Sequence, residues 1–228
     1  MSNAQKKIWV VITAFEEESI IADVIKGALL QSHNIVIVDD GSTDETGAIA
    51  HREGAYVLRH LFNLGQGAAL RTGMEFALSM GAELIVTMDA DGQHDARDIP
   101  LMVSRMMEEG ADVALGNRFS GKVIGISWQR RFILICAWIL TRVSSGIAIS
   151  DSQIGFRIFT AEAATRLSIT QNRMAYASEL VQQIARLKLK IVEVPVTVVY
   201  TAYSKRKGQS GLNSINIIID LILGKLLK

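Results

Sequence analysis

Short apolar runs rich in β-branched residues alternate along the first half of this chain with segments in which apolar residues recur every three or four positions. The apolar runs cover residues 8–12, 35–38, 55–58, 84–87 and 113–115. The helical segments between them cover residues 19–30, 43–53, 68–80 and 99–109. Strands separated by helices pair in parallel, so the pattern predicts an α/β fold with a mostly parallel central sheet flanked by helices.

The second half of the chain carries a different pattern. It predicts a glycine-rich loop over 116–125, a helix over 128–143, strands over 155–159 and 191–194, and helices near 161–167 and 178–187. In the first half, Ser42 followed by Glu45 predicts a capping box for the helix over 43–53. No linker or internal repeat divides the sequence, so we expect one domain over 1–228. Within it, residues 1–5 are typical of a tag remnant and 212–228 predict an amphipathic C-terminal helix.

Charge and cysteine content exclude several classes of protein. The 24 basic and 23 acidic residues leave a net charge of +1, so there is no long-range field of the kind that attracts nucleic acid. A single cysteine, Cys136, excludes a disulfide within the chain. No stretch reaches the roughly 18 apolar residues of a membrane-spanning helix. The apolar stretch over 8–15 is too short for a signal peptide, so we expect a cytoplasmic protein.

Acidic side chains follow two of the predicted strands at the point where each strand ends. Asp39 and Asp40 follow the second strand, and Asp89, Asp91 and Gln93 follow the fourth. Ligands of doubly wound sheets bind at this edge, and a nucleotide with a divalent cation explains the clustering. Oxygen ligands from Asp91 and Gln93, completed by phosphates and water, suit Mg²⁺ or Mn²⁺. Taken alone, the same turn is also typical of a solvated loop.

Three motifs, in this order and at this spacing, resemble those of family 2 glycosyltransferases. They are Val38-Asp39-Asp40-Gly41-Ser42-Thr43-Asp44, Asn63-Leu64-Gly65-Gln66-Gly67 and Asp89-Ala90-Asp91-Gly92-Gln93-His94. Segments at 116–119, 128–131 and 151–157 are similar to the dolichyl-phosphate mannose synthase branch, and the likeness covers roughly residues 8–212. The resemblance implies a GT-A fold. It also implies inverting transfer of a sugar from a nucleotide-sugar, of the GDP-mannose or UDP-glucose type, to a polyprenyl phosphate.

The same resemblance implies the site residues. It places the nucleotide base and ribose against Thr13, Phe15, Glu17, Val38 and Asp40. It assigns metal binding to Asp89, Asp91 and Gln93. Phosphates are expected at Arg118 and Arg131, and at a basic covering loop over 203–210 through Lys205 and Lys207. The chain departs from the common family pattern at 13–17 and at Gln66, where the family often has lysine.

The acceptor decides whether a catalytic base is needed. A phosphate oxygen is already anionic, so its attack requires no strong general base, whereas a hydroxyl acceptor does. Glu179 lies near the position of a catalytic acid in other family 2 enzymes, but a helix-start residue favoured by the dipole is an equal alternative. His94, beside the acidic turn, is more typical of a hydrogen-bonding loop residue.

Two further functions remain open at this point: transfer to a polysaccharide or another lipid, and a nucleotide-sugar binding module without turnover. The segment 128–143 combines arginines with tryptophan and isoleucine, which is typical of an interfacial helix. It predicts a peripheral protein on the cytoplasmic face of a membrane. Packing against the core, or against a second subunit, is the alternative, which leaves room for a homo-oligomer or a membrane-protein partner.

Overall fold

The computed structural model describes residues 6–126, 128, 135, 138, 149–173 and 175–207. The strands are β1 (Ile8–Ala14), β2 (Ile35–Asp39), β3 (Tyr56–Arg59), β4 (Leu84–Asp89), β5 (Val113–Ile124), β6 (Arg157–Thr160) and β7 (Ile191–Val199). The helices are α1 (Ile21–Leu29), α2 (Thr46–Arg52), α3 (Gln66–Ser79), α4 (Ile99–Glu109), α6 (Ala161–Arg166), α7 (Tyr176–Arg186) and α8 (Ala202–Lys207). A 3₁₀ turn, η1 (Ala96–Asp98), precedes α4.

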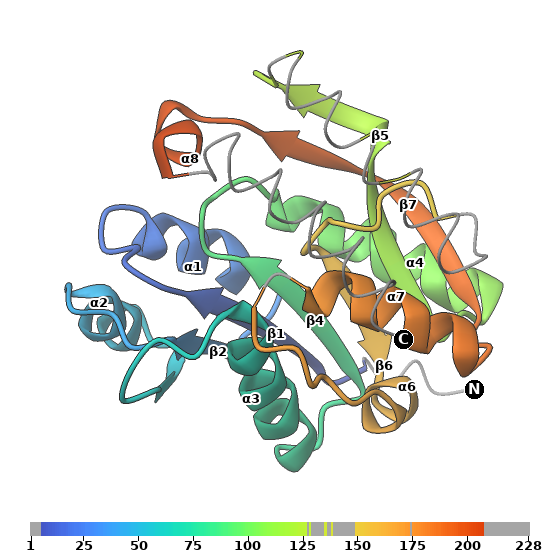
Figure 1. Cartoon of the computed structure of the whole chain (residues 1–228), viewed down its shortest axis with the longest axis horizontal. Coiled ribbons are helices and arrows are strands. Elements are labelled where there is room, and N and C mark those ends of the chain that lie inside the picture. Colours follow the sequence, from blue (N-terminus) through green and yellow to red (C-terminus); the bar gives the residue numbers. More distant parts are fainter. Residues whose placement is uncertain are drawn as a thin grey trace, which may run out of the picture.

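One seven-stranded sheet organises these elements, with helices on both of its faces (Figure 1). Its strand order is β3-β2-β1-β4-β6-β5-β7. Strand β6 runs antiparallel to both neighbours, whereas the other paired strands run parallel. The prediction of a mostly parallel α/β sheet is therefore confirmed.

The two faces of the sheet carry separate hydrophobic cores. Val10 and Ile12 of β1 point to the core shared with α1, α2 and α4, whereas Trp9 and Val11 point to the core shared with α3, α6 and α7. Successive side chains of a strand point to opposite faces, so a strand covered on both sides is apolar throughout. This explains why the sequence shows continuous apolar runs at these strands.

The predicted glycine-rich loop over 116–125 is wrong, because β5 continues to Ile124. Strand β5 pairs with β7 to the last residue of each strand, with a register shift between Asn117 and Lys122. A Cβ at Gly121 would lie 2.1 Å from the carbonyl oxygen of Val196, so glycine allows the two backbones to approach here. The glycines mark an irregular strand and not the end of one.

The predicted capping box at α2 is also wrong. The helix begins at Thr46, later than expected, and Ser42 Oγ instead accepts a hydrogen bond from the N–H of Glu16. Asp44 Oδ1 accepts from the N–H of Thr46 at 3.0 Å and takes over the turn before the helix. Ser42 therefore ties the β2–α2 loop to the loop after β1.

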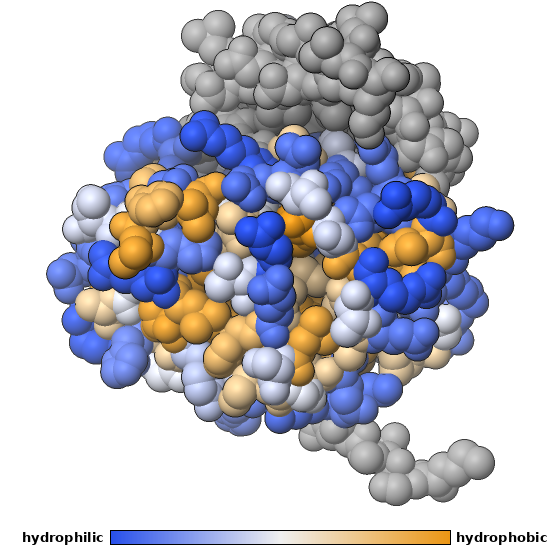
Figure 2. Space-filling model, turned by 60° about the horizontal axis from the view of Figure 1, so that its bottom comes forward, coloured by the Kyte–Doolittle hydropathy of each residue, from blue (hydrophilic) through white to orange (hydrophobic). Residues whose placement is uncertain are grey.

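Several large apolar side chains remain at the surface. Leu61 is 98% exposed, Leu30 78% and Trp128 76%. Figure 2 shows one face of the molecule, on which apolar patches are interrupted by hydrophilic side chains. No helix in the described part of the chain has the length and apolar character needed to cross a membrane. Most of the helix predicted over 128–143, and the segments 1–5 and 212–228, lie outside the described residues.

Candidate functional site

The predicted site residues gather where the carboxyl ends of β1, β2 and β4 meet. Thr13 of β1 pairs with Val38 of β2 on one side and with Asp89 of β4 on the other. Asp40 follows directly, and its N–H donates to the carbonyl of Ala14 at 2.8 Å. The side chain of Val38, however, is fully buried and packs against Gly73 of α3. Of this group, Thr13, Asp40 and Asp89 present side chains near the edge.

Asp89 and Asp91 form a carboxylate pair in unlike surroundings. Asp89 Oδ1 accepts a hydrogen bond from Gln66 Nε2 at 2.6 Å, and its Oδ2 lies 3.4 Å from His94 Nε2. Burial acts to raise the pKa of Asp89, but the contact with His94, together with the charges of Arg157 and Arg118, holds that pKa below its ordinary value. Burial and the charge of Asp89 raise the pKa of Asp91 to about 6. The two carboxylates repel each other, and a bound cation relieves that repulsion.

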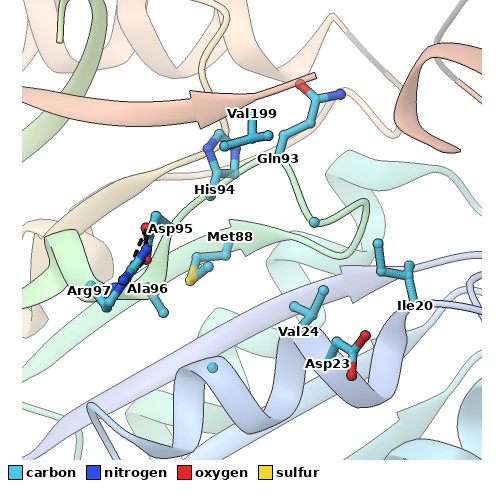
Figure 3. Close-up of a pocket in the computed structure, with 12 residues that line it drawn as sticks. Ile20, Asp23, Val24, Met88, Gln93, His94, Asp95, Ala96, Arg97 and Val199 are labelled. Atoms are coloured by element: carbon cyan, nitrogen blue, oxygen red, sulfur yellow. Dashed lines mark hydrogen bonds and ion pairs between the residues drawn. The ribbon is translucent and has the colours of Figure 1, made fainter. Parts of the chain in front are cut away.

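This carboxylate pair fits a hard divalent cation. Mg²⁺ and Mn²⁺ are held through one or two carboxylates, with water and substrate phosphates as the other ligands. Among the described residues, no group of three or more His, Cys, Asp and Glu side chains has metal-binding geometry, so those other oxygens would be required. Gln93 joins the pair through its backbone N–H, which donates to Asp91 Oδ1 at 3.0 Å. The side chain of Gln93, which was predicted as a metal ligand, is buried and extends away from the carboxylate pair toward the end of β7 (Figure 3).

A cavity of about 340 Å³ lies beside the same turn, on the face covered by α1. Its wall is formed by α1, Met88 and residues 92–97 (Figure 3). At its rim, Arg97 Nη2 donates to Asp95 Oδ2 at 2.6 Å. Because neighbouring side chains of a strand point to opposite faces, Met88 lines the cavity while Asp89 meets α3. The cavity and the Asp89 carboxylate therefore lie on opposite faces of the sheet.

Helix α8 holds the loop after β1. The buried carboxylate of Glu17 accepts a hydrogen bond from the Tyr203 phenol at 2.6 Å and lies 2.8 Å from Lys207 Nζ. Lys207 also donates to the carbonyl of Phe15 at 2.6 Å, and the Phe15 ring remains 41% exposed. Burial and the hydrogen bond to Glu17 raise the pKa of Tyr203 to about 12. The prediction of a covering loop over 203–210 is therefore wrong for residues 203–207, which belong to helix α8, and residues 208–210 lie outside the described part. Lys207 contacts the loop after β1 that was predicted to bind the base, and the Lys205 side chain also lies outside the described part.

Asp40 organises the loop between β3 and α3. Its Oδ1 accepts from the N–H of Leu64 at 3.0 Å and lies 2.6 Å from His60 Nδ1. Its Oδ2 accepts from the N–H of Gly65 at 2.7 Å. Gly65 has a φ of 101°, a conformation that side chains disfavour. Asp40 thereby fixes the start of α3 and the position of Gln66, its first residue.

Arg118, predicted to bind phosphate, forms a buried ion pair. Its Nε donates to Asp151 Oδ2 at 2.5 Å and its Nη1 to the Tyr200 phenol at 2.8 Å. Although burial disfavours the charged form, the charge of Asp151 and the contact with Tyr200 hold the pKa of Arg118 above its ordinary value. This fixed positive charge also acts on Asp89. Arg131, the other predicted phosphate ligand, lies outside the described residues.

Glu179, in the first turn of α7, shapes the loop that precedes the helix. Its Oε2 accepts from the N–H groups of Thr170 and Gln171, each at 3.0 Å, and its Oε1 from the Thr170 hydroxyl at 2.5 Å. The same loop packs on the start of α3, where the N–H of Gly67 donates to the carbonyl of Asn172 at 2.8 Å. Both carboxylate oxygens of Glu179 are therefore engaged in loop structure.

Three residues outside the predicted site act on Asp89, two of them by direct contact and Arg157 through its charge. Gln66 and His94 touch Asp89, and Arg157 is buried with its guanidinium carbon 5.8 Å from the centre of the Tyr176 ring. Gln66 and His94 both belong to the family motifs, and this membership was the sequence feature that could have marked them as site residues. That both side chains contact the Asp89 carboxylate could be seen only in the folded structure.

Replacing Gly155 with alanine is expected to displace Asp89. A Cβ at Gly155 would lie 2.3 Å from Asp89 Oδ2 and 2.5 Å from Oδ1, and Gly155 is itself held by a 2.8 Å hydrogen bond from Thr87 Oγ1 to its carbonyl. We expect Mn²⁺ affinity to fall about 10-fold and the free energy of unfolding to drop by about 1–3 kcal/mol. Mn²⁺ titration and denaturant unfolding measure both.

The matched control is Gly27→Ala on α1. A Cβ there meets nothing within 4 Å, so Mn²⁺ affinity should stay close to that of the wild type. The free energy of unfolding should rise by about 0.5–1 kcal/mol, because alanine is favoured over glycine inside a helix. Equal Mn²⁺ affinity in the two variants would contradict the account of Gly155.

Known proteins resemble this chain over most of its length. It is 36% identical over 225 residues to an uncharacterized protein of Methanocaldococcus jannaschii, covering 96% of this chain and 93% of that one. It is 30% identical over 247 residues to the UDP-N-acetylglucosamine–dolichyl-phosphate N-acetylglucosaminyltransferase of Methanococcus voltae, covering 98% of each. It is 28% identical over 227 residues to the polyprenol monophosphomannose synthase of Mycolicibacterium smegmatis, covering 93% of this chain and 83% of that one.

The fold is shared with solved glycosyltransferase structures. Glucosyl-3-phosphoglycerate synthase from Mycobacterium tuberculosis, in complex with Mn²⁺ and UDP-glucose, superposes with a TM-score of 0.71 at 19% identity, covering 97% of this chain and 79% of that one. The sequence model described as Glycosyl transferase family 2 matches residues 9–167, which is well over half of the chain. With acidic motifs at the ends of β2 and β4, in a mostly parallel sheet of GT-A type, the chain belongs to the family 2 glycosyltransferases.

Proposed function

We propose that this glycosyltransferase transfers a sugar, with inversion, from a nucleotide-sugar of the GDP-mannose or UDP-glucose type to a polyprenyl phosphate, using Mg²⁺ or Mn²⁺. The observation that carries the proposal is the Asp89 and Asp91 pair, in which the pKa of Asp91 is raised to about 6 at the edge where nucleotides bind. Relatives named for transfer to dolichyl phosphate and for polyprenol monophosphomannose synthesis support the acceptor.

In this proposal the residues divide the work by position. Asp89 and Asp91 hold the cation, with Gln93 shaping their turn. When bound, the cation neutralises charge on the departing nucleoside diphosphate. The base and ribose lie against Thr13, Phe15, Glu17 and Asp40, and Val38 contributes backbone only. Arg118 and Arg131 offset repulsion between the phosphates of donor and acceptor, and Lys205 and Lys207 contact the pyrophosphate of the donor.

The surroundings of Glu179 favour a phosphate acceptor over a hydroxyl. Glu179→Gln is expected to keep turnover within about 5-fold of the wild type, because an anionic phosphate oxygen needs no strong general base. Loss of one charged acceptor at the 170–171 loop should lower the free energy of unfolding by about 1 kcal/mol. Steady-state kinetics and urea unfolding give the two values. A drop of 100-fold or more in a folded variant would point to a hydroxyl acceptor that needs Glu179 as base.

The reaction takes place, we propose, on the cytoplasmic face of a membrane, where the lipid acceptor is held; the composition of the segment 128–143, typical of an interfacial helix, supports this. Flotation with neutral and anionic liposomes tests this part separately. If the protein stays at the bottom of both gradients, the proposed membrane contact is wrong, whereas the proposed sugar transfer is unaffected.

The decisive experiment is transfer of radiolabelled sugar from a panel of GDP- and UDP-sugars to a short polyprenyl phosphate, with Mg²⁺, Mn²⁺ or EDTA. Label that enters the organic phase only with metal establishes the reaction and identifies the donor. If nucleotides bind but no label moves to any polyprenyl phosphate, the acceptor proposed here is wrong.

A further inference from the structure

We propose that Gln66 and His94 are positioning residues that fix the Asp89 carboxylate for metal binding, and that Gln66 does so without neutralising its charge. The inference rests on the metal-dependent function proposed above. Gln66 comes from the first turn of α3, and His94 from the turn after β4.

The two side chains hold different oxygens of one carboxylate. Gln66 Nε2 donates to Oδ1 at 2.6 Å, and His94 Nε2 lies 3.4 Å from Oδ2. Gly155 closes a third side, because a Cβ at this position would lie 2.3 Å from Oδ2 and 2.5 Å from Oδ1. With a donor on each oxygen and backbone on a third side, the Asp89 carboxylate is held in one orientation.

Gln66 is itself anchored by backbone. It is the first residue of α3, and the N–H of Gly65 before it is bound by Asp40. The residue after it, Gly67, donates its N–H to the carbonyl of Asn172 at 2.8 Å. Gln66 therefore reaches Asp89 from a fixed point, and its amide position follows from the start of the helix.

His94 is anchored from the other side of β4. The N–H of Val199 donates to the carbonyl of Gln93 at 2.9 Å, and His94 forms an antiparallel bridge with Val198, so the turn is tied to the end of β7 (Figure 3). The ring lies 5.3 Å from that of Phe156, centre to centre, and the side chain is 4% exposed. A ring held this way cannot follow Asp89 if the carboxylate turns.

The neutrality of Gln66 matters for the cation. An amide N–H occupies one lone pair of Oδ1 and leaves the carboxylate charge in place. A lysine amino group at the same position would orient Asp89 equally well but would add a positive charge beside the cation. Repulsion between the lysine ammonium and a cation bound at Asp89 should lower the cation affinity about 10- to 100-fold.

The test is Mn²⁺ affinity, measured from the free-ion electron paramagnetic resonance signal in the presence of UDP and, separately, of GDP. Gln66→Met keeps length and helix propensity but removes the donor, and should weaken Mn²⁺ binding about 10-fold. Gln66→Lys should weaken it about 10- to 100-fold. Glu75→Gln, which adds the same unit of charge at an exposed position of α3, is the control and should change it less than 2-fold.

A double variant separates positioning from general structure. If both side chains fix one carboxylate, the losses in Gln66→Met and His94→Ala should combine to less than their product, because the first already frees Asp89. Thermal unfolding in EDTA identifies variants that fold, and a merely structural role would lower the melting temperature while leaving the Mn²⁺ affinity of the folded protein unchanged. His94→Ala alone still tests the proposal if a Gln66 variant does not fold.

Each outcome is decisive. Mn²⁺ affinity within 2-fold of the wild type in folded Gln66→Met, Gln66→Lys and His94→Ala overturns the inference and leaves the proposed function standing. No Mn²⁺ binding by the wild type with either nucleotide overturns the metal assignment and the inference together. Mn²⁺ binding without sugar transfer to polyprenyl phosphate removes the proposed acceptor only.

Discussion

Replacing Asp91 with asparagine is expected to abolish sugar transfer and, at the same time, to make the metal-free protein more stable. The folded protein holds the Asp91 proton more tightly than the unfolded chain, with a pKa of about 6 against an ordinary 3.8. Stability without metal therefore falls as pH rises from about 4 to about 6, and the loss is complete above that range. Since one pKa unit corresponds to about 1.4 kcal/mol, asparagine should add about 1–3 kcal/mol at pH 8.

Urea unfolding in EDTA at pH 8 and pH 4.5 measures this gain, which should shrink at the lower pH. Transfer activity should fall by at least about 100-fold because a cation ligand is lost. Asp95→Asn is the matched control four residues along: the hydrogen bond from Arg97 holds the pKa of Asp95 below its ordinary value, so its removal should not stabilise. If Asp91→Asn is less stable than the wild type at pH 8, the ionised Asp91 carboxylate does not destabilise the metal-free protein, and the raised pKa assigned to it is wrong.

Removing the charge of Asp151 is expected to be among the most destabilising single changes in the chain. Asp151 is 3% exposed and Arg118 is 6% exposed, with Nε and Oδ2 at 2.5 Å. Asp151→Asn leaves the guanidinium buried without its counter-charge, for which the expected cost is about 3–5 kcal/mol. The double variant with Arg118→Met removes both charges and should recover part of that loss. Chemical denaturation of the two variants measures the difference.

An exposed ion pair provides the comparison. Arg105 and Glu109 lie one turn apart on α4 at 3.5 Å, and both side chains are more than 40% exposed. Breaking that pair with Glu109→Gln should have a much smaller effect, because solvent screens surface pairs. If Asp151→Asn is no more destabilising than Glu109→Gln, the buried pair is not a structural support of the site.

The sheet was predictable from sequence because its central strands are covered on both faces. Continuous apolar runs at β1, β2 and β4 leave few other ways to bury them. Strand β5 was predicted too short, since its outer half carries Gly116, Gly121 and exposed residues, and only pairing with β7 makes it a strand. Apolar periodicity carries no information on that pairing.

The site was predictable in its location but not in its contacts. Parallel strands place Asp89 and Asp40 at one edge regardless of detail. The partners of the predicted site residues come from segments distant in sequence: Gln66 is 23 residues from Asp89, and Asp151 is 33 residues from Arg118. The sequence could suggest a phosphate ligand at Arg118, whereas its burial and its ion pair depend on how three segments pack.

The insertion of β6 between β4 and β5 also sets an order for synthesis and folding. A growing chain that has produced β1 to β4 can pair them in parallel, but the free edge of β4 finds its neighbour only after residues 157–160 emerge. Strand β5, made earlier, must likewise wait for β6 before it joins the sheet. During that interval an apolar strand edge is open to pairing with other chains. Truncations ending between residues 125 and 156 should therefore aggregate, which makes the antiparallel strand a checkpoint for solubility as well as the link between the two halves of the sheet.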